Sequence, residues 1–229
     1  MALTTADRLQ RIGRQSAELV KDDMLVGLGT GTTAAAMIDA LGERVREGLA
    51  FTGVATSLES RKRAMDLGIT IVELDEIDRL DLCIDGADEI DRDLNLTKGG
   101  GGALLFEKLV ARRADYYVII SSDEKLVDHL GTRMALPVEV VPVGWTHTAQ
   151  AISQLGLSPR IRQHDGVPFV TDGGHTILDC DWPDEPIDPV RLATDLKAMT
   201  GVVEHGLFIG MADMVFTINA DGEIDSHKK

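Results

Sequence analysis

A lysine, a run of bare backbone amides and a carboxylate occur together in one stretch of the chain. Lys98 precedes four glycines, Gly99-Gly100-Gly101-Gly102, and Glu107 follows nine positions after the lysine in an apolar, helix-like segment. Four successive glycines are costly in conformational entropy, so the chain here needs close backbone approach, positive φ angles, or both. A fixed cation, N–H donors and a carboxylate are the groups that move a proton beside a developing oxyanion. We therefore expect this stretch to act on a small anionic ligand.

Apolar residues surround Glu107 along the chain and do not form a single stripe. They are Ala103, Leu104, Leu105, Phe106, Leu109 and Val110. A helix with this pattern is expected to be buried on more than one side, and burial beside other carboxylates would raise the pKa of Glu107 toward that of a general base. The alternative is a surface glutamate beside Lys108.

A second glycine-rich segment, Gly27-Leu28-Gly29-Thr30-Gly31-Thr32-Thr33, lies between a strand-like run and a helix-like run. Glycines there give a ligand access to backbone N–H groups, and a helix N-terminus favours anions. The segment is a poor dinucleotide fingerprint, because Thr32 stands where that pattern has glycine or alanine, and it lacks the lysine of a Walker A loop. It predicts a phosphate-binding turn, with a purely structural tight turn as the alternative.

An acidic segment, Asp85-Gly86-Ala87-Asp88-Glu89-Ile90-Asp91, follows a hydrophobic strand. Asp85 should therefore lie at the edge of a sheet, where its carboxylate can touch a ligand. The alternatives are a capped acidic turn and a divalent-metal loop, although the spacing does not match an EF-hand.

Lys125 is the other cation that we track. It is expected in the first turn of a helix, where a cation is unfavourable unless an anion lies nearby. The six histidines show no metal-binding spacing, and no serine lies in a nucleophile elbow, so we expect neither a metal site nor serine hydrolysis.

Strand-like and helix-like runs alternate from Leu25 to Ser122, which predicts a parallel-sheet, Rossmann-like α/β domain covered by helices. Thr56 and Glu59 predict a capping box for a helix that ends at Gly68. Past Pro137 the runs become shorter and predict a smaller α+β domain. We expect residues 1–130 and 206–229 to form the α/β domain and residues 131–205 the smaller one. The tail Asp225-Ser226-His227-Lys228-Lys229 is expected to fray.

The runs expected after Pro137 are strands at 137–143, 160–163, 169–171, 175–179 and 202–205, helices at 147–155 and 189–199, and further strand at 207–218.

Composition limits the partners. The 229 residues carry a net charge of −15, and the densest basic run, Arg61-Lys62-Arg63, is a helix face, so nucleic acid is not expected. No apolar run approaches the roughly 20 residues of a membrane span, and the charged N-terminal helix is not a signal peptide. Cys83 and Cys180 stand in apolar contexts and are expected to be buried thiols, which favours a cytoplasmic protein.

Taken in order, these motifs resemble those of the ribose-5-phosphate isomerase A family. The matching segments are Gly27–Ala34, Asp85–Glu89, Lys98–Leu104 with Glu107, Leu136-Pro137-Val138-Glu139-Val140, Gly201-Val202-Val203 and Gly206-Leu207-Phe208. The resemblance spans nearly the whole chain. It implies cofactor-free, metal-free interconversion of D-ribose 5-phosphate and D-ribulose 5-phosphate through an enediolate, in the non-oxidative pentose phosphate pathway. It also implies a homo-oligomer, a dimer or a tetramer.

The resemblance assigns roles to residues of this sequence. Glu107 matches the proton-shuttling base, and Asp85 and Asp88 match acids that touch the sugar and help to open its ring. Lys98 and the amides of Gly99, Gly100 and Gly101 match the segment that steadies the enediolate oxygen. The substrate-binding set is completed by Thr30, Gly31, Thr32, Thr33, Gly86, Ala87 and Lys125. Around Lys125 the chain departs from the family pattern, with Ser122 and Glu124 in place of an acid and a serine.

Two alternative functions remain open from the residues alone. One is a non-enzymatic sugar-phosphate-sensing domain, although no basic helix-turn-helix precedes the first βα unit. The other is a relative of the acyl-CoA transferases with a nucleophilic glutamate, although this chain is short for an adenine-binding region.

Overall fold

A computed structural model describes residues 3–228, which divide into two units. The α/β unit contains residues 3–87, 106–126 and 211–228, and the small unit contains residues 88–105 and 127–210. The expected boundaries put residues 88–105 with the α/β domain. In the structure they are grouped with the small unit, because strands β5 (Glu89–Ile90) and β6 (Leu96–Thr97) pair with each other and with β14 (Leu207–Phe208).

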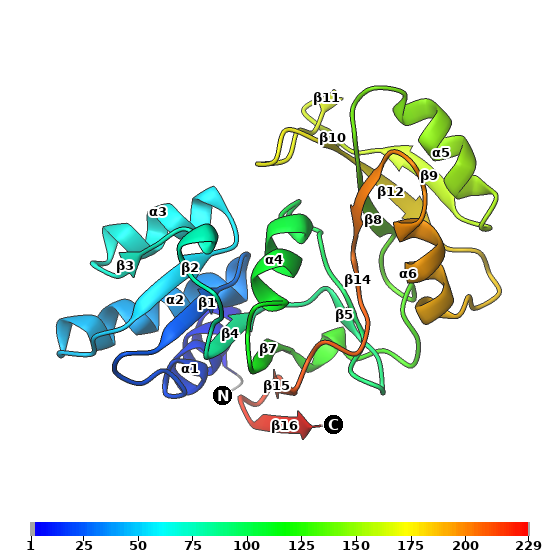
Figure 1. Ribbon diagram of the computed structural model, residues 1–229. Helices are drawn as coiled ribbons and strands as arrows, with labels where there is room; N and C mark the ends of the chain where they lie inside the picture. The colour runs from blue at the N-terminus through cyan, green and yellow to red at the C-terminus, as the bar shows by residue number, and fades with distance from the viewer. Residues whose placement is uncertain (1–2, 229) are drawn as a thin grey trace. The chain divides into compact units, whose positions relative to one another are not determined.

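A seven-stranded sheet forms the centre of the α/β unit (Figure 1). Its order is β16-β15-β7-β4-β1-β2-β3, and all its pairings are parallel except that of β16 with β15. The strands are β1 (Leu25–Leu28), β2 (Thr52–Ala55), β3 (Thr70–Ile71), β4 (Leu82–Asp85), β7 (Tyr117–Ser122), β15 (Met214–Ile218) and β16 (Ile224–Lys228). The expectation of an α/β fold with a parallel sheet is confirmed.

Alternate residues of a strand point to opposite faces of the sheet. Helices of this unit pack against both faces. Val26, Leu28, Ile84 and Ile120 join one apolar core with residues of α1 (Thr5–Ala17) and α2 (Thr32–Arg46). A helix on the other face, α4 (Leu104–Ala111), brings Val110 against Gly27, where a Cβ would lie 2.8 Å from Val110 Cγ1 and 2.7 Å from Cys83 Sγ. A residue larger than glycine would therefore push α4 off the sheet.

The helix after β2, α3 (Leu58–Asp66), begins one residue later than the predicted capping box requires. The Thr56 hydroxyl donates to the carbonyl of Leu28 on the neighbouring strand, at 3.0 Å. Ser57 is the N-cap instead, and its Oγ accepts from the Ser60 amide at 3.1 Å. The predicted Thr56 box is wrong, while the predicted end at Gly68 is confirmed by its φ of 83°.

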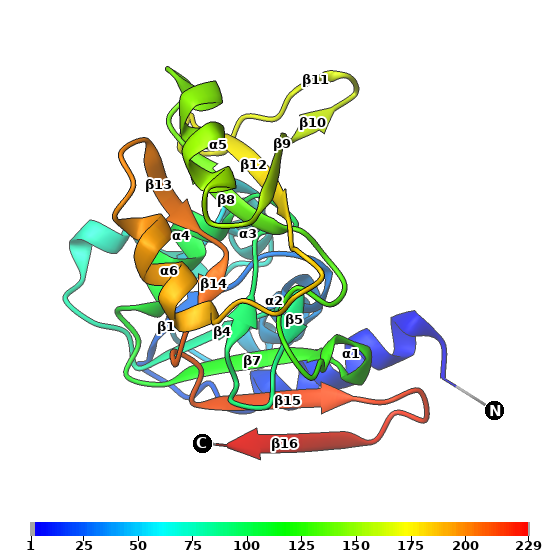
Figure 2. The same cartoon turned by 90° about the vertical axis from the view of Figure 1, so that its right-hand side faces the viewer.

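The C-terminal tail is ordered into a strand, so the prediction of fraying is wrong for the described residues 225–228. Strand β16 pairs antiparallel with β15 over five residue pairs, from Met214 with Lys228 to Ile218 with Ile224. Figure 2 shows the two strands side by side, running in opposite directions. The pairing satisfies backbone groups that β15 would otherwise expose at the sheet edge. Lys229 lies outside the described residues.

The small unit is an α+β arrangement. A four-stranded antiparallel sheet has the order β13-β8-β12-β9, and its strands are β8 (Leu136–Val140), β9 (Ser158–Ile161), β12 (Thr176–Asp181) and β13 (Val202–His205). Helices α5 (Trp145–Ser153) and α6 (Pro189–Lys197) supply Ile152, Leu192 and Leu196 to an apolar core with this sheet. A two-stranded ribbon, β10 (Gln163–His164) with β11 (Val167–Pro168), extends from β9.

Most of the runs expected after Pro137 are confirmed, with shifts at their ends. The strand expected at 169–171 is absent as a strand: Val170 makes an isolated bridge to Thr176 and nothing longer. The run at 207–218 is interrupted between Phe208 and Met214, so it forms two short strands, β14 and β15.

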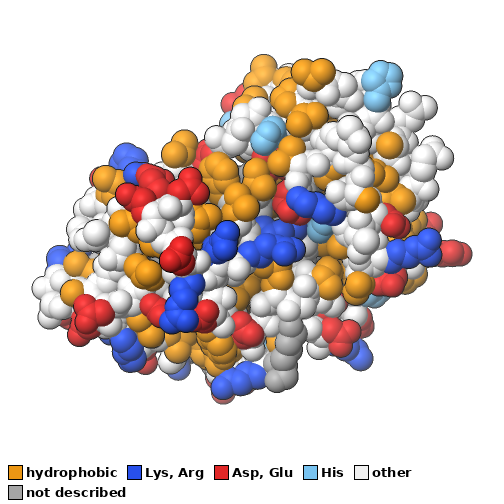
Figure 3. Space-filling view, in the orientation of Figure 1, with side chains coloured by type: hydrophobic (Ala, Val, Ile, Leu, Met, Phe, Trp, Pro, Cys, Tyr) orange, Lys and Arg blue, Asp and Glu red, His pale blue; other side chains and the backbone are white. Residues whose placement is uncertain are grey.

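Acidic side chains gather on the surface near α3 (Figure 3). This agrees with the net charge of −15. Within residues 3–228, no helix has the length and apolar character needed to cross a membrane.

Candidate active site

The turn from β1 into α2 is closely packed against Asp85 at the end of β4. A Cβ on Gly29 would lie 2.2 Å from Asp85 Oδ1 and 2.5 Å from the Asp85 Cα, a separation that no side chain tolerates. The carboxylate of Asp85 accepts from the Thr30 amide at 3.0 Å and from the Gly86 amide at 2.7 Å. Asp85 is fully buried. It therefore fixes this turn in addition to any contact with a ligand, so the predicted structural and ligand-binding roles are compatible.

Thr30 is held by its hydroxyl as well as by its amide. Its Oγ1 lies 2.7 Å from Thr56 Oγ1 and donates to Ser57 Oγ at 2.9 Å, both of which follow β2. Gly31, with a φ of 95°, then precedes α2 as its N-cap and provides no side-chain hydrogen bond. The first-turn amides of α2, with exposed Thr32 and half-buried Thr33, are accordingly placed to bind an anion.

Glu107 is buried, with 5% of its surface exposed, so the alternative of a surface glutamate is wrong. Leu109 of the same helix is 46% exposed, so α4 is less enclosed than its sequence predicts. Two facts explain the location of Glu107: α4 lies against the sheet at Gly27, and Glu107 precedes Val110 by three residues and so shares its face.

Tyr117 lies on β7 beside Cys83 of β4. Its hydroxyl is buried and has no hydrogen-bond partner within residues 3–228. Burial raises the pKa of Tyr117 well above its ordinary value, and the neighbouring acidic groups of Asp85, Cys83 and Glu107 raise it further. Asp85 of β4 and Glu107 of α4 therefore both raise the pKa of the same buried phenol in the α/β unit.

Lys125 lies in a short 3-10 turn, Asp123–Lys125, that follows β7, so the expected α-helical first turn is not formed. Its side chain is half-buried. Arg8 of α1 approaches the preceding residue, with Nη1 3.7 Å from Glu124 Oε1. Two cations thus lie near the carboxyl end of β7.

The small unit carries the remaining candidates, Asp88 and the Lys98–Gly101 segment. Asp88 Oδ2 accepts from the Gly100 amide at 2.8 Å, which brings these two expected site residues together. Lys98 is 3% exposed, its amide donates to the Gly206 carbonyl at 2.8 Å, and its Nζ lies 5.6 Å from the centre of the Phe208 ring. Because the Gly100 amide already donates to Asp88, a ligand could accept from this amide only in addition to Asp88 or in its place.

The tetraglycine turn needs glycine both for positive φ angles and for close approach of other groups to its backbone. Gly99 and Gly102 have φ angles of 107° and 87°, in the region that favours glycine. A Cβ on Gly102 would also lie 2.5 Å from the ring of Phe169. Gly100 and Gly101 are exposed and present their backbone at the surface of this unit.

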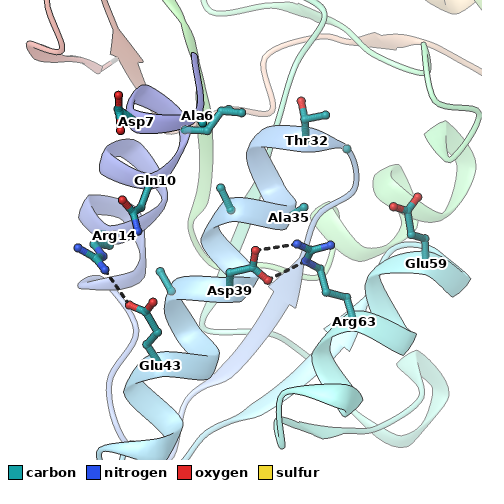
Figure 4. Close-up of a pocket in the computed structure, with 14 residues that line it drawn as sticks. Ala6, Asp7, Gln10, Arg14, Thr32, Ala35, Asp39, Glu43, Glu59 and Arg63 are labelled. Carbon is teal, nitrogen blue, oxygen red and sulfur yellow. Dashed lines mark hydrogen bonds and ion pairs between the residues drawn. The ribbon is translucent and has the colours of Figure 1, made fainter. Parts of the chain in front are cut away.

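A hollow of about 790 Å³ lies between α1, α2 and α3 (Figure 4). Of the glycine-rich turn between β1 and α2, only Gly31 and Thr32 line it. Its two arginines are already paired, Arg63 with Asp39 at 2.6 and 2.8 Å and Arg14 with Glu43 at 3.2 Å. Asp85, Glu107 and Tyr117 are not among the residues that line this hollow.

Comparison with known proteins identifies the family. Residues 52–222 match the family described as ribose 5-phosphate isomerase A (phosphoriboisomerase A). The chain belongs to this family. The ribose-5-phosphate isomerase A of Bacillus mycoides (strain KBAB4) is 48% identical over 202 residues, covering 88% of this chain and 91% of the relative. That of Rhodopseudomonas palustris (strain TIE-1) is 49% identical over 223 residues, covering 93% and 94%.

A solved D-ribose-5-phosphate isomerase in complex with phospho-erythronic acid is similar to the chain throughout its length. It superimposes with a TM-score of 0.95 at 33% identity and covers 99% of this chain and 100% of its own. Together with the curated relatives, this makes the chain an enzyme of the isomerase A family. It gives no support to the sensing-domain or CoA-transferase alternatives.

The sequence did not single out Tyr117 or Arg162, which the structure places beside candidate site residues of the isomerase. Tyr117 lies in a run of apolar residues, Tyr116 to Ile120, and is typical of a core position. Tyr117 could have been found only from the pairing of β7 with β4, because β4 ends at Asp85. Arg162 lies far from the glycines in sequence, and only the fold of the small unit brings it to them, at 2.7 Å from the Gly99 carbonyl.

Proposed function

We propose that this isomerase interconverts D-ribose 5-phosphate and D-ribulose 5-phosphate, and that Glu107 carries the proton between the two sugar carbons. The observation that carries the proposal is the buried carboxylate of Glu107, which acts with Asp85 on the buried phenol of Tyr117. Burial removes a carboxylate from water and so strengthens it as a base, which is the property that a general base requires.

The reaction balances with one carboxylate and no redox partner. The C2 proton of the open-chain aldose passes to Glu107, and the electron pair moves to O1 to give an enediolate. Glu107 then returns the proton at C1, while the hydroxyl proton of O2 passes to O1 and O2 becomes the ketone oxygen. Charge on the intermediate needs nearby donors, and Lys98 with the amides of Gly99 and Gly101 supplies this class of group.

The other site residues divide by chemistry. Asp85 and Asp88 are carboxylates suited to proton exchange with the sugar hydroxyls during ring opening, with Gly86 and Ala87 between them in sequence. The uncapped amides at Thr32 and Thr33, preceded by Thr30 and Gly31, suit a phosphate. Lys125 adds a cation for the same group.

We further propose that the protein is a cytoplasmic homo-oligomer, a dimer or a tetramer, that uses no cofactor. Its two cysteines are buried and are not joined to each other, which supports a reducing compartment. Exposed valines of the small unit, Val143, Val167, Val170 and Val190, support an oligomerisation role for this unit.

A coupled assay of the purified protein tests the function. Ribose 5-phosphate should be converted into ribulose 5-phosphate, and excess chelator should leave the rate unchanged. Absence of turnover with this substrate would overturn the proposed reaction, and loss of turnover with chelator would overturn the metal-free mechanism.

A further inference from the structure

Arg162 contacts the tetraglycine turn directly. It follows β9 in the small unit, and its Nη1 donates to the Gly99 carbonyl at 2.7 Å and to the Gly100 carbonyl at 3.1 Å. One guanidinium nitrogen thus holds two successive carbonyls of a turn that is otherwise flexible by composition. In the sequence, Arg162 is separated from Gly99 by 63 positions and from Gly100 by 62.

The guanidinium is itself fixed on its other edge. Its Nε donates to Asp179 Oδ2 at 3.0 Å, and its Nη2 donates to Asp179 Oδ1, so the pair is bidentate. The carbon of the guanidinium lies 5.9 Å from the centre of the Phe169 ring, which also packs on Gly102. Only 13% of the Arg162 side chain is exposed. A buried, bidentate and stacked arginine has little freedom to follow the turn if the turn moves.

The contact determines where the amides of the turn point. In a trans peptide the C=O and the following N–H point in opposite directions. The Gly99–Gly100 peptide is held at both ends, because Arg162 binds its carbonyl and Asp88 accepts from its N–H at 2.8 Å. The next peptide is held by its Gly100 carbonyl, so the Gly101 amide points away from Arg162. Within residues 3–228 that amide has no hydrogen-bond acceptor, and Gly101 is exposed.

We propose that Arg162, oriented by Asp179, is a positioning residue for the isomerase reaction. It fixes the peptide planes of Gly99 and Gly100 so that the Gly101 amide is presented to the enediolate oxygen, without touching the substrate itself. Donors that are already oriented stabilise a developing charge without reorganisation during the reaction. This inference rests on the proposed function.

A neighbouring ion pair provides a matched control. Arg160 and Asp181 lie on the same two strands, β9 and β12, and form the same bidentate pair at 2.8 and 2.9 Å. Their side chains are 66% and 48% exposed, and the hydrogen bonds of Arg160 within residues 3–228 go to Asp181 and not to the glycines. If ion pairs between these strands matter only for folding, disrupting either pair should have the same kind of effect.

The experiment compares Arg162→Lys, Arg162→Gln and Asp179→Asn with Arg160→Gln and the wild type. Each protein is assayed for kcat and KM with ribose 5-phosphate and for inhibition by phospho-erythronic acid, whose carboxylate resembles the oxygen pair of the enediolate. Thermal melting checks folding. The wild-type rate is the reference, so a failure of the proposed function appears as absence of wild-type turnover and is separate from this test.

We expect Arg162→Gln and Asp179→Asn to lower kcat by about 10- to 100-fold, since a displacement of about 1 Å in a catalytic donor has effects of this size. The inhibition constant of phospho-erythronic acid should rise by about the same factor, while KM changes little, because the lost interaction belongs to the transition state. Arg162→Lys should fall between them and the wild type, and Arg160→Gln should match the wild type.

The proposal is overturned if folded Arg162 and Asp179 variants retain wild-type kcat, or if kcat falls with no change in phospho-erythronic acid inhibition. It is also overturned if Arg160→Gln causes the same loss. Should the Arg162 variants fail to fold, Asp179→Asn alone decides between these outcomes, because the arginine is then retained while the carboxylate that orients it toward Gly99 and Gly100 is not.

Discussion

At several positions of this protein, the residue type is fixed by the space that its neighbours leave. Gly29 has no room for a Cβ because Asp85 occupies that space, and the Asp85 carboxylate in turn fixes the amides of Thr30 and Gly86. Tyr117, on the neighbouring strand β7, has a buried hydroxyl that no described residue binds. A buried polar group without a hydrogen-bond partner lowers the stability of the folded protein. The hydroxyl of Tyr117 is therefore expected to be destabilising, and phenylalanine, which lacks it, is not.

The substitution Tyr117→Phe should therefore raise the free energy of unfolding by about 1 kcal/mol, and the gain should grow at alkaline pH. The pKa of Tyr117 in the folded protein is raised well above 10, whereas an unfolded tyrosine has a pKa of about 10. Below pH 10 the phenol is neutral in both states. As the pH rises above 10, the unfolded phenol ionises first, and the wild type loses stability that the variant cannot lose.

Urea unfolding at about pH 8 and about pH 10.5 measures this difference. Tyr116→Phe serves as the control, because Tyr116 is only half-buried. An equal loss of stability with pH in the wild type and Tyr117→Phe would show that the phenol of Tyr117 is hydrated in the folded protein.

At the scale of secondary-structure elements, the sequence predicts the features that depend only on residues close together along the chain. The glycine turn after β1, the end of α3 at Gly68 and the strand at Val202–His205 follow from turn residues and apolar periodicity, and the structure confirms them. The start of α3 at Ser57 could not be predicted locally, because the Thr56 hydroxyl is drawn to Leu28 on another strand. The strand β16 is polar and forms only because β15 offers an unpaired edge.

The capping box of α1 gives a prediction at this scale. The Thr4 side chain accepts from the Asp7 amide, and Asp7 accepts from the Thr4 amide at 3.0 Å. The Asp7 carboxylate accepts from the Thr4 hydroxyl at 2.6 Å as well as from the Thr4 amide, and these two hydrogen bonds, that from the hydroxyl first, lower the pKa of Asp7 below its ordinary value of 3.8. A lowered pKa means that the stabilisation is present above pH 3.8 and is lost as the pH falls below that value.

Asp7→Asn should accordingly be less stable than the wild type at neutral pH, and the gap should close in acid. Urea midpoints of the two proteins between about pH 6 and about pH 3 test this expectation. A gap that stays constant over the range would mean that the carboxylate charge of Asp7 contributes nothing to the cap.

At the scale of the whole molecule, the chain forms two units that share the candidate residues between them. The chain passes from the α/β unit to the small unit between Ala87 and Asp88, within one acidic motif, and returns between Leu105 and Phe106, just before Glu107. Order along the chain was enough to propose these motifs as one set of site residues. It was not enough to find Arg162, which depends on the pairing of β9 with β12 in the small unit.

The proposed oligomer is testable through the exposed valines of the small unit. A double substitution, Val167→Glu with Val170→Glu, places charge at two positions that are 62% and 65% exposed. Light scattering after size exclusion should give the wild type a multiple of the 24.8 kDa chain mass and the variant a smaller multiple. The control is Met65→Glu on α3 of the α/β unit, where the side chain is 56% exposed. A monomeric wild type would contradict the proposed assembly, and an unchanged mass in the double variant would remove these valines from the interface.

The turnover of Glu107→Gln is the sharpest test of the proposed proton transfer, because the change removes the basic carboxylate and keeps the size of the side chain. We predict that kcat falls by roughly 10²- to 10⁴-fold, while the melting temperature stays near that of the wild type. Glu47→Gln, the same change at an exposed position after α2, should be fully active. A folded Glu107→Gln protein with turnover near that of the wild type would contradict the assignment of proton transfer to Glu107.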